Sequence, residues 1–377
     1  MEASQTGRAF ATFVTTPWHA RATFGARRTA VILSFIVTVT GSTMVCAAPA
    51  ATRPPTTLAV LGDSDSQGFE DDLSFPIGSP LRGGAWRKST LQWTEVLGRL
   101  RASDLDLGAR GVWGRPRWQA LPARLVGLTL RAPRKRDHQY NFAVSGAGCA
   151  DLLGGRWSEA RSLARLVDTE PARWRDAVVV IRIGITVLGS DDTLGALASG
   201  TRQTEMRERV AGCADAVAGT VALLRQHAPT LRFVLVGVLN DADTMANRER
   251  WRSGVEQQRI TAGLDGFDAV LRGLSAADPR IAFFDDRAWF AKRWGSRDAQ
   301  GLPAYRVWRM ADGFEVRHVD CDEPGCSVLA DGHAGMMWNV LWAQALVDLL
   351  NDRFALGIPR IDDAEAARFA ASLRAAR

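Results

Sequence analysis

The chain has 377 residues, of which 46% are hydrophobic, and this is enough for one large domain with a buried core. Its 47 Lys and Arg residues against 41 Asp and Glu residues give a formal net charge of +6. So small a basic excess, spread over a chain of this length, argues against nucleic acid as a partner.

The first fifty residues differ from the rest of the chain. A basic stretch precedes an apolar run over residues 30–45, and Ala48-Pro49-Ala50 has small residues at the spacing that a signal peptidase reads. We therefore predict a signal peptide over residues 1–50 and one mature domain with loop insertions over residues 51–377. The apolar run is shorter than the roughly 20 residues of a membrane span, and an uncleaved anchor is the alternative. The mature protein is expected to be periplasmic or secreted in a bacterium, without stable membrane insertion.

Beyond this segment, short apolar runs alternate with stretches of helical periodicity. Buried strands are predicted at residues 57–61, 140–144, 177–183, 231–238 and 281–284. Helices are predicted at residues 91–102, 158–167, 203–226, 250–274, 333–350 and 362–377. Loop-rich insertions are expected at about 70–90, 104–138 and 296–327. The alternation of strands and helices predicts an α/β fold with a mainly parallel sheet covered on both faces.

Four cysteines remain once the predicted signal peptide is removed. An even number of cysteines in an oxidising compartment favours disulfides. Cys321 and Cys326 flank a turn-rich Asp-Glu-Pro-Gly segment that could bring them together, and this leaves Cys149 to pair with Cys213. The alternative is a zinc site formed by His318, Cys321 and Cys326, but it lacks a convincing fourth ligand.

Ser64 directly follows the first predicted strand. Residues 57–61 run into Gly62-Asp63-Ser64, and ligands of α/β sheets bind beyond the carboxyl ends of the strands. A serine in this position is exposed at the start of a turn whose backbone N–H groups can stabilise an oxyanion. Gly-Asp-Ser also makes ordinary turns, and Ser66 is a rival nucleophile two residues later.

Two further motifs lie where a predicted strand or helix meets a turn. Gly146 follows the predicted strand 140–144 and could present its N–H to a reacting oxygen, or it could serve only the geometry of the turn. Asp331-Gly332-His333 precedes the last long predicted helix. An aspartate just upstream of a histidine can orient its Nδ1–H and stabilise the imidazolium, whereas the alternative is a helix cap beside a surface histidine.

Taken in order, these motifs resemble the SGNH (GDSL) hydrolases. Gly62-Asp63-Ser64, Gly146 within Asn-Phe-Ala-Val-Ser-Gly, and Asp331-Gly332-His333 look like the first, second and fifth blocks of that family. Together they extend over most of residues 57–352. The resemblance implies a flavodoxin-like three-layer α/β/α fold. It also implies an esterase, lipase or carbohydrate deacetylase activity that needs neither metal nor cofactor.

The resemblance also implies a role for each matching residue. Ser64 would be the nucleophile, His333 its base, and Asp331 the residue that orients His333. The backbone N–H groups of Ser64 and Gly146 would form part of the oxyanion hole, together with an Asn of the third block.

The chain departs from the family pattern in two places. Thr186, in Gly184-Ile185-Thr186, stands where the third block has its Asn. Its hydroxyl can donate one hydrogen bond, although it is shorter than an Asn amide. The alternative register, Gly189-Ser190-Asp191-Asp192, would place a carboxylate that repels an oxyanion. The second departure is that one residue separates Asp331 from His333, where the family usually has two.

These motifs together predict a serine ester hydrolase that forms an acyl-Ser64 intermediate. Its expected substrate is a small-molecule ester or an acylated carbohydrate. Two alternatives keep the same scaffold, namely acyl transfer to an alcohol and non-catalytic binding on a degenerate hydrolase fold. A metal-dependent phosphoesterase is disfavoured, because no cluster of His and Asp accompanies Asp63 and Asp65 in the sequence.

Overall fold

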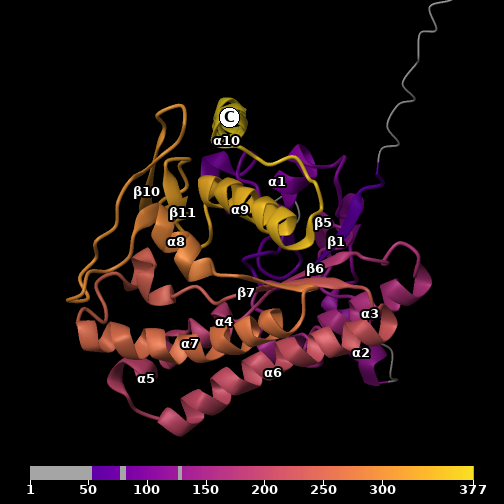
Figure 1. The fold of residues 1–377 in the computed structure, drawn as a ribbon, viewed down its shortest axis with the longest axis horizontal. Coiled ribbons are helices and arrows are strands. Elements are labelled where there is room, and N and C mark those ends of the chain that lie inside the picture. The colour runs from indigo at the N-terminus through magenta and orange to yellow at the C-terminus, as the bar shows by residue number, and fades with distance from the viewer. Residues whose placement is uncertain (1–52, 77–81, 126–129, 377) are drawn as a thin grey trace, which may run out of the picture. The chain divides into compact units, whose positions relative to one another are not determined.

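A five-stranded parallel sheet lies at the centre of the fold (Figure 1), in a computed structural model that describes residues 53–76, 82–125 and 130–376. Its strands are β1 (Thr56–Gly62), β3 (Leu105–Asp106), β6 (Val178–Arg182), β7 (Arg232–Val236) and β8 (Ile281–Phe284). They lie in the order β3-β1-β6-β7-β8. Numbered along the chain, this is the 2-1-3-4-5 order of flavodoxin-like folds. The predicted α/β fold with a parallel sheet is confirmed, while the predicted signal peptide lies outside the described residues.

The middles of the long strands are apolar because helices cover both faces of the sheet. In β1, Ala59 and Leu61 belong to one hydrophobic core, while Leu58 and Val60 belong to the other. All four side chains are 0% exposed. Successive side chains of β1 therefore point into two different cores, rather than into one core and solvent.

Two groups of helices form the outer layers. The first core is covered by α3 (Glu159–Thr169), α6 (Gln203–His227) and α7 (Gly254–Ala277). The second is covered by α1 (Trp93–Leu100), α8 (Asp286–Trp294), α9 (Met336–Phe354) and α10 (Asp363–Ala375). Figure 1 shows these two groups on opposite sides of the sheet.

Smaller elements occupy the predicted insertions and the loops near the carboxyl ends of the strands. Two small sheets have the orders β2-β5-β4 and β11-β10-β9. Their strands are β2 (Glu70–Asp71), β4 (Arg110–Trp113), β5 (Lys135–His138), β9 (Trp308–Arg309), β10 (Glu315–Asp320) and β11 (Cys326–Val328). The remaining helices are α2 (Arg117–Leu125), α4 (Ile185–Leu188) and α5 (Asp191–Ser199), with 3-10 turns at Gly84–Trp86, Cys149–Asp151, Asp241–Asp243 and Met245–Asn247.

The predicted strand at 140–144 is wrong, because two segments share one edge of β1. Strand β3 pairs with β1 only at Thr56 and Thr57. Farther along, the N–H groups of Phe142 and Val144 donate to the carbonyls of Val60 and Gly62, each at 2.8 Å. Residues 140–144 therefore run beside the end of β1 as an extended segment. Only one bridge, between Val60 and Asn141, is formed there.

Both predicted disulfides are present. Cys149 is bonded to Cys213, and Cys321 is bonded to Cys326. The zinc alternative is therefore wrong, since both thiolates are consumed. His318 is also occupied, with Nδ1 at 2.9 Å from Ser327 Oγ and Nε2 at 2.8 Å from the carbonyl oxygen of Asp243. Among the helices of the described ranges, none has the length and apolar character needed to cross a membrane.

Candidate active site

The end of β1 is shaped by a close contact with β6. A Cβ added at Gly62 would lie 1.9 Å from the carbonyl oxygen of Arg182, so only glycine fits at this position. The Gly62 N–H donates to the buried Glu159 carboxylate at 2.7 Å. The strand then gives way to a turn in which the N–H groups of Ser66 and Gln67 both donate to the carbonyl of Asp63, at 3.1 Å.

Ser64 lies in this turn and reaches a cleft, which Asp65 also lines. It is 8% exposed and lines a cavity of about 560 Å³. Ser66, the rival nucleophile, is 0% exposed and does not line that cavity. Its Oγ instead accepts from the Trp93 indole at 3.4 Å. Of the two serines, only Ser64 can therefore meet a ligand without a rearrangement of the turn.

Three side chains, two from the start of α1 and one from β6, hold the Ser64 turn in place. The Gln92 amide donates to the carbonyl of Ser64 at 3.3 Å. Arg182 Nη1 and the Trp93 indole both donate to the carbonyl of Asp65, at 2.9 and 3.1 Å. A preorganised turn of this kind keeps its N–H groups in fixed directions. Within the described residues, the Ser64 N–H makes no hydrogen bond to the protein.

His333 lines the same cleft, but not from a helix. Helix α9 begins at Met336, three residues later than the sequence motif suggests. His333 instead sits in a turn between β11 and α9, where its carbonyl accepts from the N–H of Leu329 at 2.7 Å. Its Nδ1 lies 3.1 Å from Oδ1 of Asp331. This leaves Nε2 as the ring nitrogen that is not committed to Asp331.

Asp331 is held by charge on two sides. Its Oδ2 accepts from Nε of Arg82 at 2.9 Å, and Arg82 is only 2% exposed. Burial alone would raise the pKa of Asp331. The hydrogen bond and charge of His333, together with Arg82, nevertheless hold that pKa well below its usual range. Asp331 is therefore an anion at every pH at which an esterase would work.

The structure brings Ser64, Thr186, Asp331 and His333 to one cleft, although no hydrogen bond joins Ser64 to His333 within the described residues. Gly146 is not among the residues that line the cleft. It is exposed, has φ 75° and would place a Cβ in open space. Its N–H, like that of Ser64, makes no hydrogen bond within the described part of the chain.

The Gly146 turn is fastened to the turn that carries Ser64 and to α4. The N–H of Ser145 donates to Oε1 of Gln67 at 2.8 Å. The Thr186 hydroxyl donates to the carbonyl of Ala147 at 2.5 Å. A hydroxyl has a single proton. In this arrangement the Thr186 proton is used within the protein, and donation to a substrate would require the hydroxyl to rotate.

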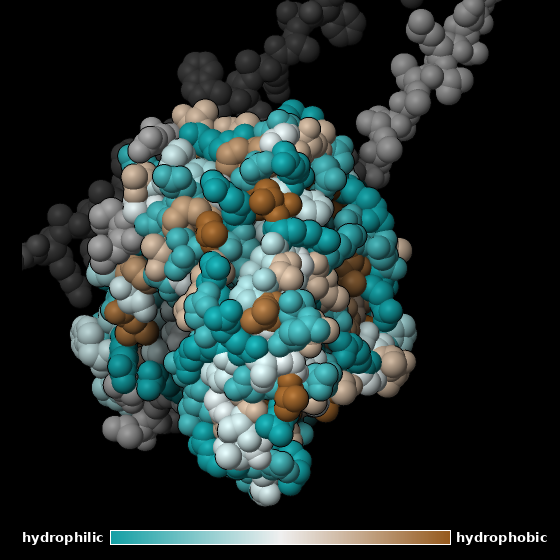
Figure 2. Space-filling view, turned by 90° about the vertical axis from the view of Figure 1, so that its left-hand side faces the viewer, coloured by the Kyte–Doolittle hydropathy of each residue, from teal (hydrophilic) through white to brown (hydrophobic). Residues whose placement is uncertain are grey.

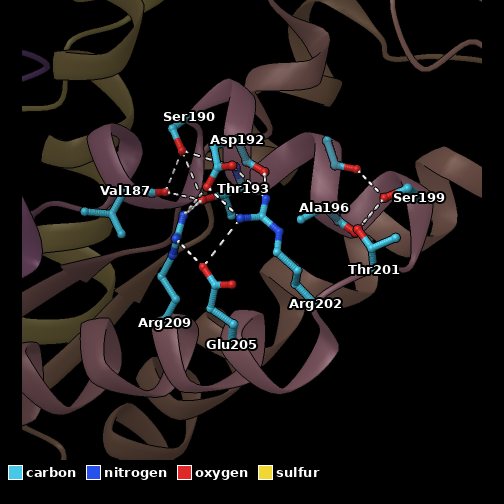
Figure 3. A network of polar contacts seen from close by, with 11 residues as sticks. Val187, Ser190, Asp192, Thr193, Ala196, Ser199, Thr201, Arg202, Glu205 and Arg209 are labelled. Carbon is cyan, nitrogen blue, oxygen red and sulfur yellow. Dashed lines mark hydrogen bonds and ion pairs between the residues drawn. The ribbon is translucent and has the colours of Figure 1, made fainter.

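The wall of the cleft that carries Thr186 is anchored on α6 by a polar network (Figure 3). The Thr193 hydroxyl donates to the carbonyl of Val187 at 2.7 Å and accepts from Arg209 at 2.7 Å. Arg209 also pairs with Asp192 at 3.0 Å and with Glu205 at 2.8 Å. The short helix α4 is thereby tied to α5 and α6, which limits its movement toward or away from Ser64.

Carboxylates predominate among the charged residues of the cleft. The aspartates that line it are Asp65, Asp191, Asp241, Asp243, Asp320 and Asp331, and the basic lining residues are Arg182, His318 and His333. Asp241 makes no hydrogen bond or ion pair through its carboxylate within the described residues. Burial raises the pKa of Asp241 to about 7, with smaller contributions from the neighbouring aspartates.

Asp63, a buried acid, lies directly beside Ser64 in the chain. Asp63 is 1% exposed, and burial, reinforced by the charge of Asp65, raises the pKa of Asp63 to about 8. Its Oδ1 accepts from the N–H of Asp65 at 3.0 Å. Asp63 therefore stabilises the turn by this hydrogen bond and does not line the cavity.

No group of three or more His, Cys, Asp or Glu side chains in the described ranges has the geometry of a metal site.

Figure 2 shows the side of the fold on which β10 and β11 lie in Figure 1. Hydrophilic residues cover most of that face, and its apolar residues stand singly or in small groups.

Sequence reasoning missed several residues that shape the site. Arg82 lies in a predicted loop insertion, 249 residues from Asp331. Phe290 and Trp338 line the cleft from α8 and α9, with ring centroids 5.4 Å apart. No local pattern marks these side chains, because each becomes part of the site only through tertiary packing.

The comparisons with known proteins add no family assignment. No family model matches the sequence, and no curated protein matches it. Several solved structures show distant similarity. An extracellular lipase from Streptomyces rimosus is 17% identical, with a TM-score of 0.33, over 66% of this chain and 86% of the lipase. A phospholipase A1 from Streptomyces albidoflavus is 15% identical, with a TM-score of 0.38, over 79% of this chain and 99% of that one.

An acetyl xylan esterase from the rumen bacterium Butyrivibrio proteoclasticus is 13% identical, with a TM-score of 0.35. The match covers 81% of this chain and 66% of that enzyme. Identities and TM-scores this low carry no argument about activity. The case for function therefore rests on the residues of this chain.

Proposed function

We propose that this protein is an exported serine esterase that hydrolyses a carboxylic ester through an acyl-Ser64 intermediate. The observation that carries the proposal is the cleft shared by Ser64 and the hydrogen-bonded pair of Asp331 and His333. An esterase of this type needs a nucleophile, a base and a group that orients the base. These three residues supply all of them.

In the proposed mechanism, Oγ of Ser64 attacks the ester carbonyl carbon while Nε2 of His333 takes the hydroxyl proton. The developing imidazolium is stabilised by Asp331, whose lowered pKa keeps it anionic. The tetrahedral intermediate collapses as His333 returns the proton to the leaving alcohol. Water then attacks the acyl-serine with His333 again as base, and the acid is released.

The oxyanion of each tetrahedral intermediate would be stabilised by backbone N–H groups. The N–H groups of Ser64 and Gly146 are the proposed donors, and both are free of protein partners within the described residues. Thr186 is proposed as a third contributor. Removal of one such donor typically costs about 10²–10³ in kcat.

The chemistry of the cleft bears on the substrate. Phe290 and Trp338 reach the cleft with only 2% and 3% of their surfaces exposed, so the aromatic wall that they offer to an acyl chain or a sugar ring is small. The excess of aspartates beside them disfavours an anionic ester. We therefore propose an uncharged ester, such as an acylated carbohydrate, as the substrate class. Export is supported by the two disulfides, because such bonds persist in oxidising compartments.

The proposal is tested by steady-state kinetics on p-nitrophenyl esters of increasing chain length, beside acetylated sugars. Ser64→Ala and His333→Ala should each lower kcat by about three orders of magnitude while the protein stays folded. Ser66→Ala is the matched control and should keep most of the parental kcat, because Ser66 does not line the cleft. Parental turnover by Ser64→Ala would refute the assignment of the nucleophile.

A further inference from the structure

Arg82 contacts the catalytic aspartate without lining the cleft itself. Its Nε lies 2.9 Å from Oδ2 of Asp331. The other oxygen of the same carboxylate, Oδ1, lies 3.1 Å from Nδ1 of His333. One carboxylate thus joins a buried guanidinium to the imidazole of the proposed base.

Aromatic rings fix the position of the Arg82 guanidinium. Its Cζ lies 4.1 Å from the ring centroid of Phe75 and 5.3 Å from that of Phe69. The planar guanidinium suits such contacts, and they leave its edge free for a carboxylate. Arg87 has its Cζ 5.5 Å from the centroid of Phe69 as well, but it pairs with Glu70 at 3.0 Å instead of Asp331.

We propose that Arg82 is a positioning residue for the catalytic pair. It holds the Asp331 carboxylate in the orientation that fixes His333, and it offsets part of the negative charge that His333 experiences. This inference rests on the proposed function, since it concerns the base of that reaction. A group that holds the partner of a catalytic side chain can matter greatly, because a small misplacement of the base slows proton transfer.

The two effects of Arg82 have different signatures. Loss of the orienting contact should lower kcat. Loss of the positive charge leaves the Asp331 anion uncompensated, so the imidazolium of His333 becomes easier to form. The acid limb of the kcat/KM profile should then move to higher pH, because a larger share of His333 is protonated and inactive at a given pH.

Other charged groups surround the pair and must stay constant in the test. Those that share the cleft with His333 are Asp65, Asp191, Asp241, Asp243, Asp320, Arg182 and His318. Asp322 accepts from the N–H of Ala330, next to Asp331, at 3.2 Å. Asp71 and Arg87 are the remaining charges that act on Arg82. Substitution of Arg82 alone leaves all of them in place.

The experiment compares Arg82→Gln, Arg82→Lys and the matched control Arg87→Met. The control also removes a cation that contacts Phe69, but one that does not touch Asp331. Two quantities are measured across pH, namely kcat/KM for a responsive ester and the NMR titration midpoint of the His333 imidazole. The NMR measurement requires no turnover, and thermal melts report whether each variant is folded.

Arg82→Gln should move the acid limb and the His333 midpoint upward by about half a pH unit or more. It should also lower kcat by about tenfold. Arg82→Lys keeps the positive charge. The acid limb of its kcat/KM profile and its His333 midpoint should therefore match those of the parent, while its kcat falls. Arg87→Met should resemble the parent in all respects. If Arg82→Gln does not fold, a parental kcat in Arg82→Lys would by itself overturn the positioning role.

An Asp331→Asn background shows whether Arg82 acts through Asp331. There, Arg82→Gln should cause little further loss of kcat, because the orienting bond to the carboxylate is already gone, although removal of the Arg82 charge should still raise the His333 midpoint. A midpoint unmoved by Arg82→Gln in the parental background would overturn the inference, as would an undiminished loss of kcat in the Asp331→Asn background. If the parent shows no turnover that depends on Ser64, the proposed function fails instead, and the NMR comparison still tests the coupling.

Discussion

Oδ1 of Asp331 lies 3.1 Å from Nδ1 of His333, although only Gly332 separates the two residues in the chain. The turn that allows this has Gly332 in the left-handed region, at φ 87°. The same Oδ1 accepts from the backbone N–H of His333 at 3.2 Å. The contact between Asp331 and His333 is thus largely local, and Arg82 ties it to the rest of the fold.

The first prediction concerns Thr186, whose hydroxyl donates to the carbonyl of Ala147 at 2.5 Å. Thr186→Val keeps the shape but deletes this bond, and should loosen the turn that carries Gly146. We expect kcat to fall roughly tenfold to a hundredfold, with KM little changed. Thr186→Ser, which keeps the hydroxyl, is the control and should lose much less. A Thr186→Val kcat within about twofold of the parent would leave Thr186 with a packing role only.

The second prediction compares the two disulfides. Cys149 and Cys213 are 64 residues apart in sequence, whereas Cys321 and Cys326 are 5 apart. Because a longer loop loses more entropy when closed, replacing the first pair by alanine should cost about 4 kcal/mol of unfolding free energy, against about 2 kcal/mol for the second. Urea denaturation of the two double mutants measures the difference. Equal losses would contradict the loop-closure account.

The third prediction uses Asp241, whose pKa is raised to about 7 in the folded protein. The folded state keeps a proton that the unfolded chain releases above pH ~4, so stability must fall as pH rises from about 4 to about 7. Asp241→Asn removes this loss. It should be more stable than the parent at pH 8, by roughly 2 kcal/mol or more, and not at pH 4.

Urea denaturation of Asp241→Asn at both pH values makes the measurement. Asp191→Asn is the control, because Asp191 lines the same cleft but is exposed and pairs with Arg250 at 2.7 Å. It should show no such gain at pH 8. A stability difference between Asp241→Asn and the parent that does not change with pH would contradict the partly buried, protonated state of Asp241.

Local sequence patterns predicted much of the fold. The predicted strand 281–284 has the observed bounds of β8, because a short apolar run between helical stretches has few other solutions. The position of Ser64 at the end of β1 followed from the same reasoning. The edge strand beside β1 is β3 and not the predicted strand 140–144. This could not be foreseen, because β3 is only two residues long and is defined by its pairing.

The site was predictable only where its contacts are local. Asp331 and His333 lie two residues apart, and a sequence motif can mark such a pair. The contact between Thr186 and Ala147 joins α4 to a loop, and the contact of Arg82 with Asp331 joins segments 249 residues apart. Neither leaves a periodic or compositional trace, because each depends on how the loops pack at the carboxyl ends of the strands.

The central claim, that Ser64 is an activated nucleophile, is tested most directly by covalent labelling. The folded parent is incubated with a fluorophosphonate probe, and the modified residue is identified by peptide mass mapping. The account predicts a single adduct on Ser64, which is absent from Ser64→Ala, retained in Ser66→Ala and slowed by His333→Ala. No adduct on the folded parent, or an adduct on another serine, would contradict it.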